Sequence, residues 1–311
     1  MKYYIGIDLG GTNVRVAKVD EDGNIVKDII KPSRALEGPK AINDNIIEIL
    51  KEYNMSDVEG IGLAIPGPVD SEKNVITQAT NIPGCEGYPF ADNIEKEFGK
   101  KVILDNDANV AGLAESMFGA GRGHKTVFYI THSTGIGGAL IIDQKIHSGH
   151  KGYAGEVANV IVDPQAKAYP NYTHLNRGGV ETVASGTALR LIGEEILGEE
   201  GNSSIKIFEL ARKCDERALA IVDKMCKDLG TCLAAISAVV APDCFVIGGG
   251  CSKANDVYFE TLRKYFKNMA HPGMRDVPIK LAELDEPGVV GAAMLVKSRE
   301  KWFTQLKTIS Y

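Results

Sequence analysis

The chain has 311 residues, 44% of them hydrophobic and 24% charged, which is enough apolar material for one large or two medium-sized cores. Its 35 Lys and Arg residues against 41 Asp and Glu residues give a net charge of −6, which argues against nucleic acid or an anionic membrane as the main partner. No apolar run reaches the roughly 20 residues of a membrane-spanning helix, and Asp8 comes too early for a signal peptide.

Alternating strands and helices are predicted from the start of the chain. Two strands enclose Leu9-Gly10-Gly11-Thr12 and predict a hairpin. Hydrophobic residues then recur at helical spacing from Ile42 to Leu50, and a later strand stops at Pro66-Gly67-Pro68. In chain order we expect strands at residues 3–8, 13–20 and 24–31, a helix at 38–53, a strand at 58–64, a helix at 90–98, a strand at 101–104 and a helix at 107–118.

The same pattern begins again after the aperiodic, Gly-rich residues 119–123. We expect a strand at 126–131, a turn at 132–138, a strand at 139–143, helices at 185–197, 205–212 and 216–240, a strand at 244–247, a helix at 257–269, a strand at 278–282 and a helix at 288–302. This repetition predicts an α/β fold of two domains with a duplicated mixed sheet, and it places the boundary near residue 119.

Cysteine and glycine usage add two expectations. None of the six cysteines belongs to a CxxC or CxC pair, so we expect reduced thiols in a cytoplasmic protein. The 34 glycines exceed the roughly 22 of average usage. Ten of them gather in four short segments, which we interpret as backbone cleared for a nucleotide: Gly10, Gly11, Gly135, Gly137, Gly138, Gly248, Gly249, Gly250, Gly288 and Gly291.

Each hairpin tip has a sequence suited to a phosphate. In Asp8-Leu9-Gly10-Gly11-Thr12-Asn13 the glycines expose backbone N–H groups, Thr12 and Asn13 can donate hydrogen bonds, and the acid suits Mg²⁺. Ser133-Thr134-Gly135-Ile136-Gly137-Gly138 repeats the pattern without the acid. A tight turn would explain either segment alone, but together they predict two loops that hold one polyphosphate from both sides.

A third glycine segment, Val246-Ile247-Gly248-Gly249-Gly250, ends a predicted buried strand. Glycines there can lie beneath a ribose or a base. A Rossmann dinucleotide site fits this segment poorly, because polar residues 252–256 follow and the GxGxxG spacing is absent.

Two acids and two asparagines stand where a predicted strand meets a helix, in Leu104-Asp105-Asn106-Asp107-Ala108-Asn109. Asp107, at or near the helix N-cap, can be merely structural. A carboxylate at this place can also accept the proton of an alcohol during phosphoryl transfer. The residues alone leave both interpretations open.

Two further acids, Glu156 and Glu181, each stand among small residues. Such acids suit hydrogen bonds to sugar hydroxyls, although each can also be a solvated loop acid, and Glu181 can stabilise the first turn of a helix. His147, His150 and His174 lack a regular framework and a fourth ligand, so we interpret them as loop surface rather than a zinc site.

These motifs, in this order, resemble those of the ROK sugar kinases, whose actin-like ATPase (ribonuclease H-like) fold also includes hexokinase and Hsp70. The resemblance runs essentially end to end and rests on residues 8–12, 64–70, 81–84, 105–109, 133–138, 154–156, 181–186, 246–250 and 291–293. It implies a glucokinase-like enzyme that phosphorylates a hexose with ATP, at O6. It also implies a small domain of residues 1–119 completed by the helix near 297–311, a large domain of 120–296, a cleft for Mg-ATP between them, and a homodimer.

The resemblance assigns roles to single residues. Asp107 stands at the position of the catalytic base, and Asp8 at that of the Mg²⁺ partner, through water. The sugar-binding positions are Gly67, Asn81, Asn106, Asp107, Glu156, Asn159 and Glu181. The nucleotide-binding positions are Gly10, Gly11, Thr12, Asn13, Thr134, Gly135, Gly249 and Gly250.

One departure from the family concerns its zinc site, which uses one histidine and three cysteines. Here Asn159, Tyr172, His174 and Gly179 stand at those four positions, so we predict no structural zinc. Because the missing histidine usually contacts the sugar, Asn159 takes its place, and this puts the identity of the sugar in doubt.

Several alternatives stay open. Glucose is the first candidate substrate, and an N-acetylhexosamine, N-acetylmannosamine or fructose kinase is an alternative within the family. The phosphoryl donor can be ATP or polyphosphate. From other classes, a sugar-responsive transcriptional repressor would need an added helix-turn-helix ahead of Asp8, and an actin-like nucleotide switch would not need Asn106, Asp107, Glu156 and Glu181 together.

Overall fold

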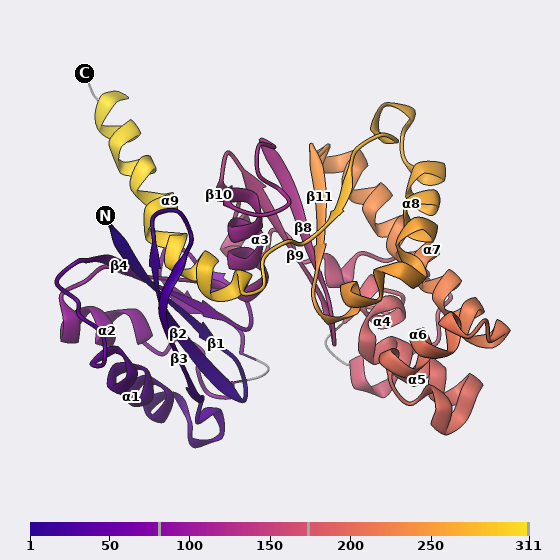
Figure 1. Ribbon diagram of the computed structural model, residues 1–311, viewed down its shortest axis with the longest axis horizontal. Helices are drawn as coiled ribbons and strands as arrows, with labels where there is room; N and C mark the ends of the chain where they lie inside the picture. Colours follow the sequence, from indigo (N-terminus) through magenta and orange to yellow (C-terminus); the bar gives the residue numbers. More distant parts are fainter. Residues whose placement is uncertain (80–81, 173–174, 310–311) are drawn as a thin grey trace. The chain divides into compact units, whose positions relative to one another are not determined.

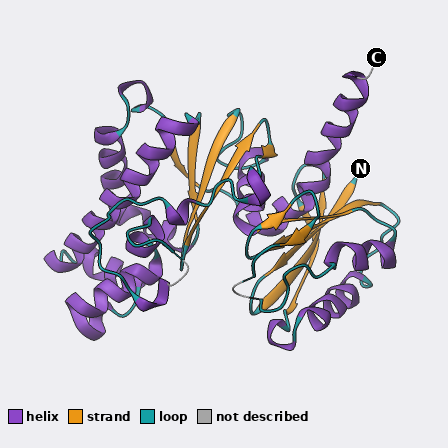
Figure 2. Ribbon diagram, turned by 180° about the vertical axis from the view of Figure 1, so that it is seen from behind, coloured by secondary structure: helices purple, strands orange, loops and turns teal. Residues whose placement is uncertain are grey.

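The computed structural model describes residues 1–79, 82–172 and 175–309, without the side chains of Asn171 and residues 300–309. The chain forms two compact units, drawn in Figure 1. The first comprises Met1–Lys125, Ala139–Ala154 and Glu283–Tyr311, and the second comprises Thr126–Gly138 and Gly155–Ala282. In each unit helices flank a sheet (Figure 2), so the predicted α/β class is confirmed.

The first sheet is mixed and has the strand order β3-β2-β1-β4-β7. β1 pairs antiparallel with β2 and parallel with β4, which in turn pairs parallel with β7. The elements of this unit are β1 (Tyr3–Leu9), β2 (Asn13–Asp20), β3 (Ile25–Pro32), α1 (Pro39–Leu50), β4 (Val58–Ile65), β5 (Val69–Asp70), β6 (Val75–Ile76), α2 (Phe90–Phe98), β7 (Val102–Asn106), α3 (Asp107–Met117) and α9 (Pro287–Ile309).

The strand period of two divides the faces of this sheet. Ile5, Ile7 and Leu9 of β1 are buried in one core with Ile42 and Ile46 of α1. The alternate residues face α9, which approaches very closely: a Cβ added to Gly6 would lie 1.9 Å from the carbonyl oxygen of Val289, and one added to Gly62 would lie 1.7 Å from that of Ala292. Glycine in β1 and β4 is therefore a packing requirement of α9.

The second sheet has the order β10-β9-β8-β11-β12, with β11 parallel to β8 and β12 and with β9 antiparallel to β10. Its elements are β8 (Thr126–His132), β9 (Ile136–Ile142), β10 (Lys145–Ile146), β11 (Cys244–Gly248) and β12 (Ile279–Leu281). The helices that follow β10 and precede β12 are α4 (Val180–Ala184), α5 (Gly186–Leu197), α6 (Ser204–Arg212), α7 (Glu216–Val240) and α8 (Asn255–Met269).

Most expected elements are present with bounds shifted by a few residues, and β5, β6, β10 and α4 were not expected. β9 begins at Ile136, although a turn was expected as far as residue 138, because the Ile136 N–H is bound by a carboxylate and the strand continues through two glycines. A Cβ at Gly138 would lie 2.8 Å from the carbonyl oxygen of Gly155, so a glycine is needed inside the strand. The short helix α4 was not expected, and only the following helix was.

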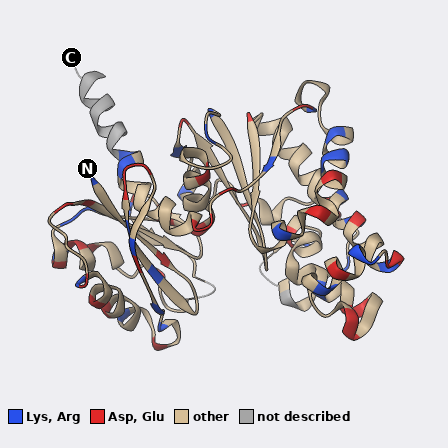
Figure 3. Cartoon of the chain, viewed as in Figure 1, with Lys and Arg blue, Asp and Glu red and all other residues tan. Residues whose placement is uncertain are grey.

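Charged residues of both signs occur along the helices of both units (Figure 3). Several form ion pairs with each other, such as Arg190 with Glu194 and Arg212 with Asp256. Within the residues that the structure describes, no helix has the length and hydropathy of a membrane span.

Candidate active site

The first unit gathers carboxylates around Asp8, the last-but-one residue of β1. Burial first, and then the negative charges of Asp107 and Glu286, raise the pKa of Asp8 to about 6, against the opposing charge of Arg15. Arg15 lies opposite Asp8 on β2 and forms ion pairs with Asp28 and Glu286. The predicted Mg²⁺ partner and the predicted catalytic base are thus brought close enough to interact electrostatically.

The junction of β7 and α3 shows which residue caps the helix. Asn106, rather than Asp107, is the N-cap, and its Oδ1 accepts from the N–H groups of Ala108 (2.9 Å) and Asn109 (3.2 Å). Its Nδ2 donates to the carbonyl oxygen of Gly67 at 3.2 Å, which joins two predicted sugar-binding positions. Asp107 is the first helical residue, so its carboxylate is stabilised by the helix N-terminus.

Asp105 has a structural role in this segment. Its side chain is buried and accepts from Asn109 Nδ2 (2.8 Å) and from Arg299 of α9 (3.1 Å). Of the two acids in the motif, Asp105 therefore ties α3 to α9, whereas Asp107 begins α3 and accepts from the Ala108 N–H. Gly67, with φ of 113° and the Gln78 carbonyl oxygen 2.2 Å from an added Cβ, can only be glycine.

The first hairpin tip is held by its own backbone. The Gly10 N–H donates to the Asn13 carbonyl oxygen (2.9 Å), and the Thr12 carbonyl oxygen accepts from the Ser33 N–H (2.8 Å). Gly11, Thr12 and Asn13 are exposed, so their N–H groups and side chains are accessible to a phosphate.

The second hairpin tip is held from outside. Ile136 N–H donates to Glu181 Oε2 at 2.7 Å, and a Cβ on Gly135 would lie 2.7 Å from the same oxygen. The carbonyl oxygens of Ser133 and Thr134 accept from the N–H groups of Gly186 and Thr187, which begin α5. Gly135, predicted to bind the nucleotide, is thus in direct contact with Glu181, predicted to bind the sugar.

Glu156 lies in the same unit as Glu181. Burial raises the pKa of Glu156, and the charge of Glu181 raises it further. Two carboxylates that share one environment favour a ligand that donates hydrogen bonds, such as a polyol, because donation to them relieves their repulsion.

A cavity of about 550 Å³ in the second unit contains two of the predicted nucleotide-binding positions, Thr134 and Gly250. Its wall also includes Ile205 and Phe208 of α6, which are far in sequence from the glycine segments, and Lys253, which follows Gly250 by three residues; none of them carries a motif that predicts a binding role. Gly249, with φ of 87°, lies too close to the His132 carbonyl oxygen for any Cβ, at 2.5 Å. The remaining lining residues are Ser133, Gly186, Thr187, Arg190, Ser203, Ser204, Arg212, Cys251 and Ala254.

The positions of the family's zinc ligands hold other interactions. Asn159 Oδ1 accepts from the Asn176 N–H (2.8 Å), and Tyr172 Oη is hydrogen-bonded to Ser185 Oγ (2.9 Å). Gly179 has no side chain, and its N–H donates to the Asn176 carbonyl oxygen. These donors do not fit a tetrahedral zinc site. His174, and Asn81 of the predicted sugar site, lie outside the described residues, among which no group of three or more His, Cys, Asp or Glu could hold a metal ion.

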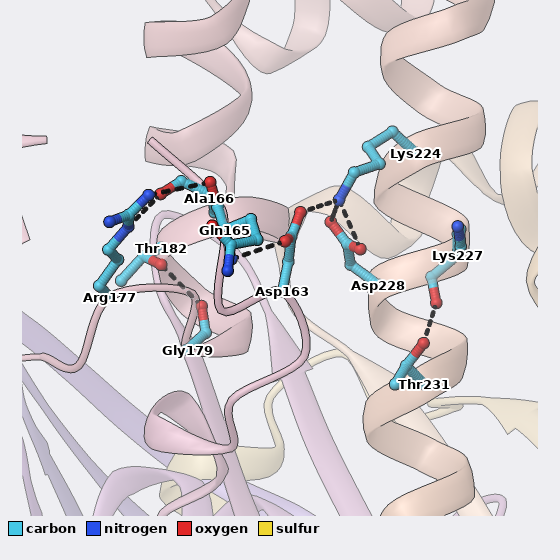
Figure 4. A network of polar contacts seen from close by, with 10 residues as sticks. All are labelled: Asp163, Gln165, Ala166, Arg177, Gly179, Thr182, Lys224, Lys227, Asp228 and Thr231. Carbon is cyan, nitrogen blue, oxygen red and sulfur yellow. Dashed lines mark hydrogen bonds and ion pairs between the residues drawn. The ribbon is translucent and has the colours of Figure 1, made fainter. Parts of the chain in front are cut away.

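Hydrogen bonds and ion pairs hold the surrounding loop (Figure 4). Lys224 of α7 binds Asp163 (2.8 Å) and the buried Asp228 (2.6 Å), and Asp163 also accepts from the Gln165 N–H. Arg177 donates to the carbonyl oxygens of Gln165 and Ala166. The described part of the loop between Asn159 and Gly179 is therefore tied to α7 and to itself by side-chain contacts.

Known proteins resemble this chain along nearly its whole length. The family model described as "ROK family" matches residues 4–299. The chain is 34% identical to a glucokinase of Halalkalibacterium halodurans over 96% of each chain, and 32% identical to a glucokinase of Thermotoga maritima over 95% of this chain and 97% of the relative.

Solved structures give the same result. The ROK hexokinase of Thermus thermophilus superimposes with a TM-score of 0.86 at 29% identity, covering 96% of this chain and 99% of that one. A ROK family glucokinase of Streptomyces griseus, in complex with glucose and AMPPNP, gives 0.73 at 30% identity, covering 94% and 98%. The predicted actin-like fold and the resemblance are confirmed, and the chain belongs to the ROK family.

Proposed function

We propose that this chain is a hexose kinase that transfers the γ-phosphoryl group of ATP to a sugar hydroxyl, O6 of glucose being the first candidate. The observation that carries the proposal is the position of Asp107: it begins α3, next to Asn106 and Gly67, and it shares its electrostatic environment with Asp8. The relatives described above as glucokinases, and the complex of one ROK glucokinase with glucose and AMPPNP, support it.

Phosphoryl transfer requires positioning and charge stabilisation from the protein and little covalent chemistry. The sugar oxygen attacks the γ-phosphorus, the bond to the β-phosphate oxygen breaks, ADP leaves, and Asp107 accepts the proton of the hydroxyl. Glu156, Glu181 and Asn159 would orient the sugar from the second unit, as would Gly67, Asn106 and Asn81 from the first. Mg²⁺, when bound beside Asp8, would neutralise charge on the β- and γ-phosphates.

The phosphate contacts follow from the two tips and the segment after β11. Gly10, Gly11, Thr12 and Asn13 would donate from the first unit, and Thr134 and Gly135 from the second. Gly249 and Gly250 would lie beneath the adenosine. The apolar side chains of Ile205 and Phe208 in the 550 Å³ cavity suit a base, which favours ATP over polyphosphate as donor.

The test is ADP release measured across a panel of hexoses, N-acetylhexosamines and fructose, with ATP and with polyphosphate as donors. We expect turnover that needs both a sugar and ATP and that is lost in Asp107→Asn. Saturable ATP turnover without any sugar would instead favour a nucleotide switch, and full activity of Asp107→Asn would remove the assigned base. An N-acetylglucosamine kinase of Aliivibrio fischeri, 29% identical, makes the amino sugars a necessary part of the panel.

A further inference from the structure

Glu115, in the last turns of α3, is a carboxylate with 0% exposure. A buried charge of this kind needs strong compensation. Four hydrogen bonds from backbone N–H groups supply it: Ala120 donates to Oε2 (2.9 Å), Glu283 donates to Oε1 (3.0 Å) and Oε2 (3.2 Å), and Leu284 donates to Oε1 (2.8 Å). No residue of the proposed active site is among the donors.

These donors belong to two segments that are far apart in sequence. Ala120 follows α3, shortly before the chain leaves the first unit after Lys125, and Glu283 is the residue at which the chain returns to it. Figure 1 shows the segment that precedes α9 running beside α3. One carboxylate therefore holds the first-unit ends of two of the four passages of the chain between the units.

The backbone after α3 is shaped around this carboxylate. The N–H groups of Gly119 and Gly121 both donate to the Glu115 carbonyl oxygen, at 3.1 and 3.0 Å. A Cβ at Gly119 would lie 2.1 Å from Oε2 and would displace it. Gly119, assigned from sequence only to an aperiodic boundary segment, thus has a specific role: it leaves room for the Glu115 side chain.

We infer that Glu115 is a positioning residue: it fixes the segment before α9 against the end of α3, and that segment leads to Glu286 and Gly288, which lie beside Asp8 in the first unit. This inference rests on the proposed kinase function, in which Asp107 is the base and Asp8 the Mg²⁺ partner, both in the same unit as Glu115. Phosphoryl transfer depends on alignment, and a displacement of about 1 Å can cost about 100-fold in rate. Connections tied by charge-assisted hydrogen bonds restrict such displacement.

The experiment compares Glu115→Gln with Glu283→Gln. The first variant keeps the shape of the side chain but turns an amide N–H₂ toward one of the backbone donors, so that donor loses its acceptor. The second removes an equal charge from an exposed side chain of the same segment, whose N–H still reaches Glu115. Gly119→Ala is a second route, because it displaces the carboxylate and keeps its charge.

For Glu115→Gln and Gly119→Ala we expect kcat to fall by about 10-fold or more, with Kd values for the sugar and for a non-hydrolysable ATP analogue changed less than about two-fold, since each ligand's contacts remain. ATP hydrolysis per sugar phosphorylated should rise, and amide exchange at Ala120, Glu283 and Leu284 should accelerate. Glu283→Gln should match the parent chain in all of these measurements.

The inference is overturned if both variants keep kcat within two-fold of the parent, or if Glu283→Gln has the same effect. It is also overturned if amide exchange at the three donors stays unchanged. If the parent chain shows no sugar-dependent ADP release, the proposed kinase function fails, whereas amide exchange still reports whether Glu115 holds the two connections.

Discussion

The two hairpin tips follow the same strand–turn–strand plan, but they obtain their acids differently. The first tip carries Asp8 on its own strand, and burial together with Asp107 and Glu286 raises the pKa of that carboxyl to about 6. The second tip has no acid of its own, and Glu181 reaches it from α4 to accept the Ile136 N–H. Under the proposed function, this difference predicts a division of labour: the first tip would serve cation and proton chemistry, and the second would join phosphate binding to sugar recognition.

The largest expected effect concerns the acids near the first tip. Asp107→Asn should lower kcat by about 10²- to 10⁴-fold, because the proton acceptor is lost. The amide Oδ1 can still accept from the Ala108 N–H, which Asp107 now binds at 2.8 Å, so the start of α3 should persist. Steady-state kinetics with unchanged thermal unfolding would support this. A rise in KM for the sugar with normal kcat would make Asp107 another binding acid, and the division of labour would fail.

Glu181→Ala tests the role of the second tip. The Ile136 N–H loses its acceptor, at a cost of about 1–3 kcal/mol, and the phosphate loop loosens together with the sugar contact. We expect KM to rise about 10-fold or more for both ATP and the sugar. Glu156→Gln is the comparison variant, because among the described residues no hydrogen bond joins Glu156 to the second tip. It should change the KM for the sugar alone. If Glu181→Ala leaves the KM for ATP unchanged, Glu181 does not couple nucleotide binding at the second tip to sugar binding.

The two tips also differ in the residue that precedes the turn. His132 ends β8, has 0% exposure and contacts the Ala184 carbonyl oxygen through Nε2, and burial lowers its pKa to about 4. The unfolded chain binds a proton at about pH 6.5 and the folded one only near 4, so stability is complete above 6.5 and decreases as the pH falls to 4.

The expected loss from His132 is about 3 kcal/mol of unfolding free energy over that window. Denaturant titrations from pH 7 to 4 should show it, and His132→Gln should have a smaller slope. His147→Gln, at an exposed position, is the control and should keep the parent slope. Equal slopes for all three proteins would mean that His132 is protonated while folded.

Much of the fold followed from local patterns, and the differences arise where distant segments meet. The two tips, the helix from residue 39 and the strand before Gly248 were predictable, because alternation and helical spacing are local. The N-cap was predicted at or near Asp107 but is Asn106, since which of two neighbouring polar residues caps a helix depends on its exact start.

The glycines show most clearly which features of the structure could not be predicted from the sequence. Gly288 and Gly291 were interpreted as backbone cleared for a nucleotide. The structure shows packing instead: a Cβ on Gly291 would lie 1.7 Å from the Val110 carbonyl oxygen of α3, and one on Gly288 would lie 2.4 Å from Asp8 Oδ2. Contacts of α9 with elements more than 170 residues earlier leave no local pattern, and the same holds for Glu115 with Glu283.

The smallest predicted effect concerns the loop that follows Asn159, which belongs to the same unit as the second tip. Lys224→Met removes the partner of the buried Asp228, whose pKa burial raises and Lys224 lowers. Because Lys224 is itself 47% exposed, we expect a loss of only about 1–2 kcal/mol in unfolding free energy. Loosening this loop should also raise the sugar KM several-fold, through Asn159 and Glu181, and leave the ATP KM unchanged.

Lys227→Met is the matched control for Lys224→Met, because Lys227 lies one turn further along α7 and, among the described residues, forms no ion pair with Asp163 or Asp228, on which its charge acts only at longer range. It should stay much closer to the parent chain than Lys224→Met in chemical unfolding and in both KM values. If Lys224→Met raises the ATP KM as much as the sugar KM, the loop acts on the whole second unit rather than on the sugar side. If neither KM moves while stability falls, the ion pairs of Lys224 stabilise the unit without positioning the sugar residues.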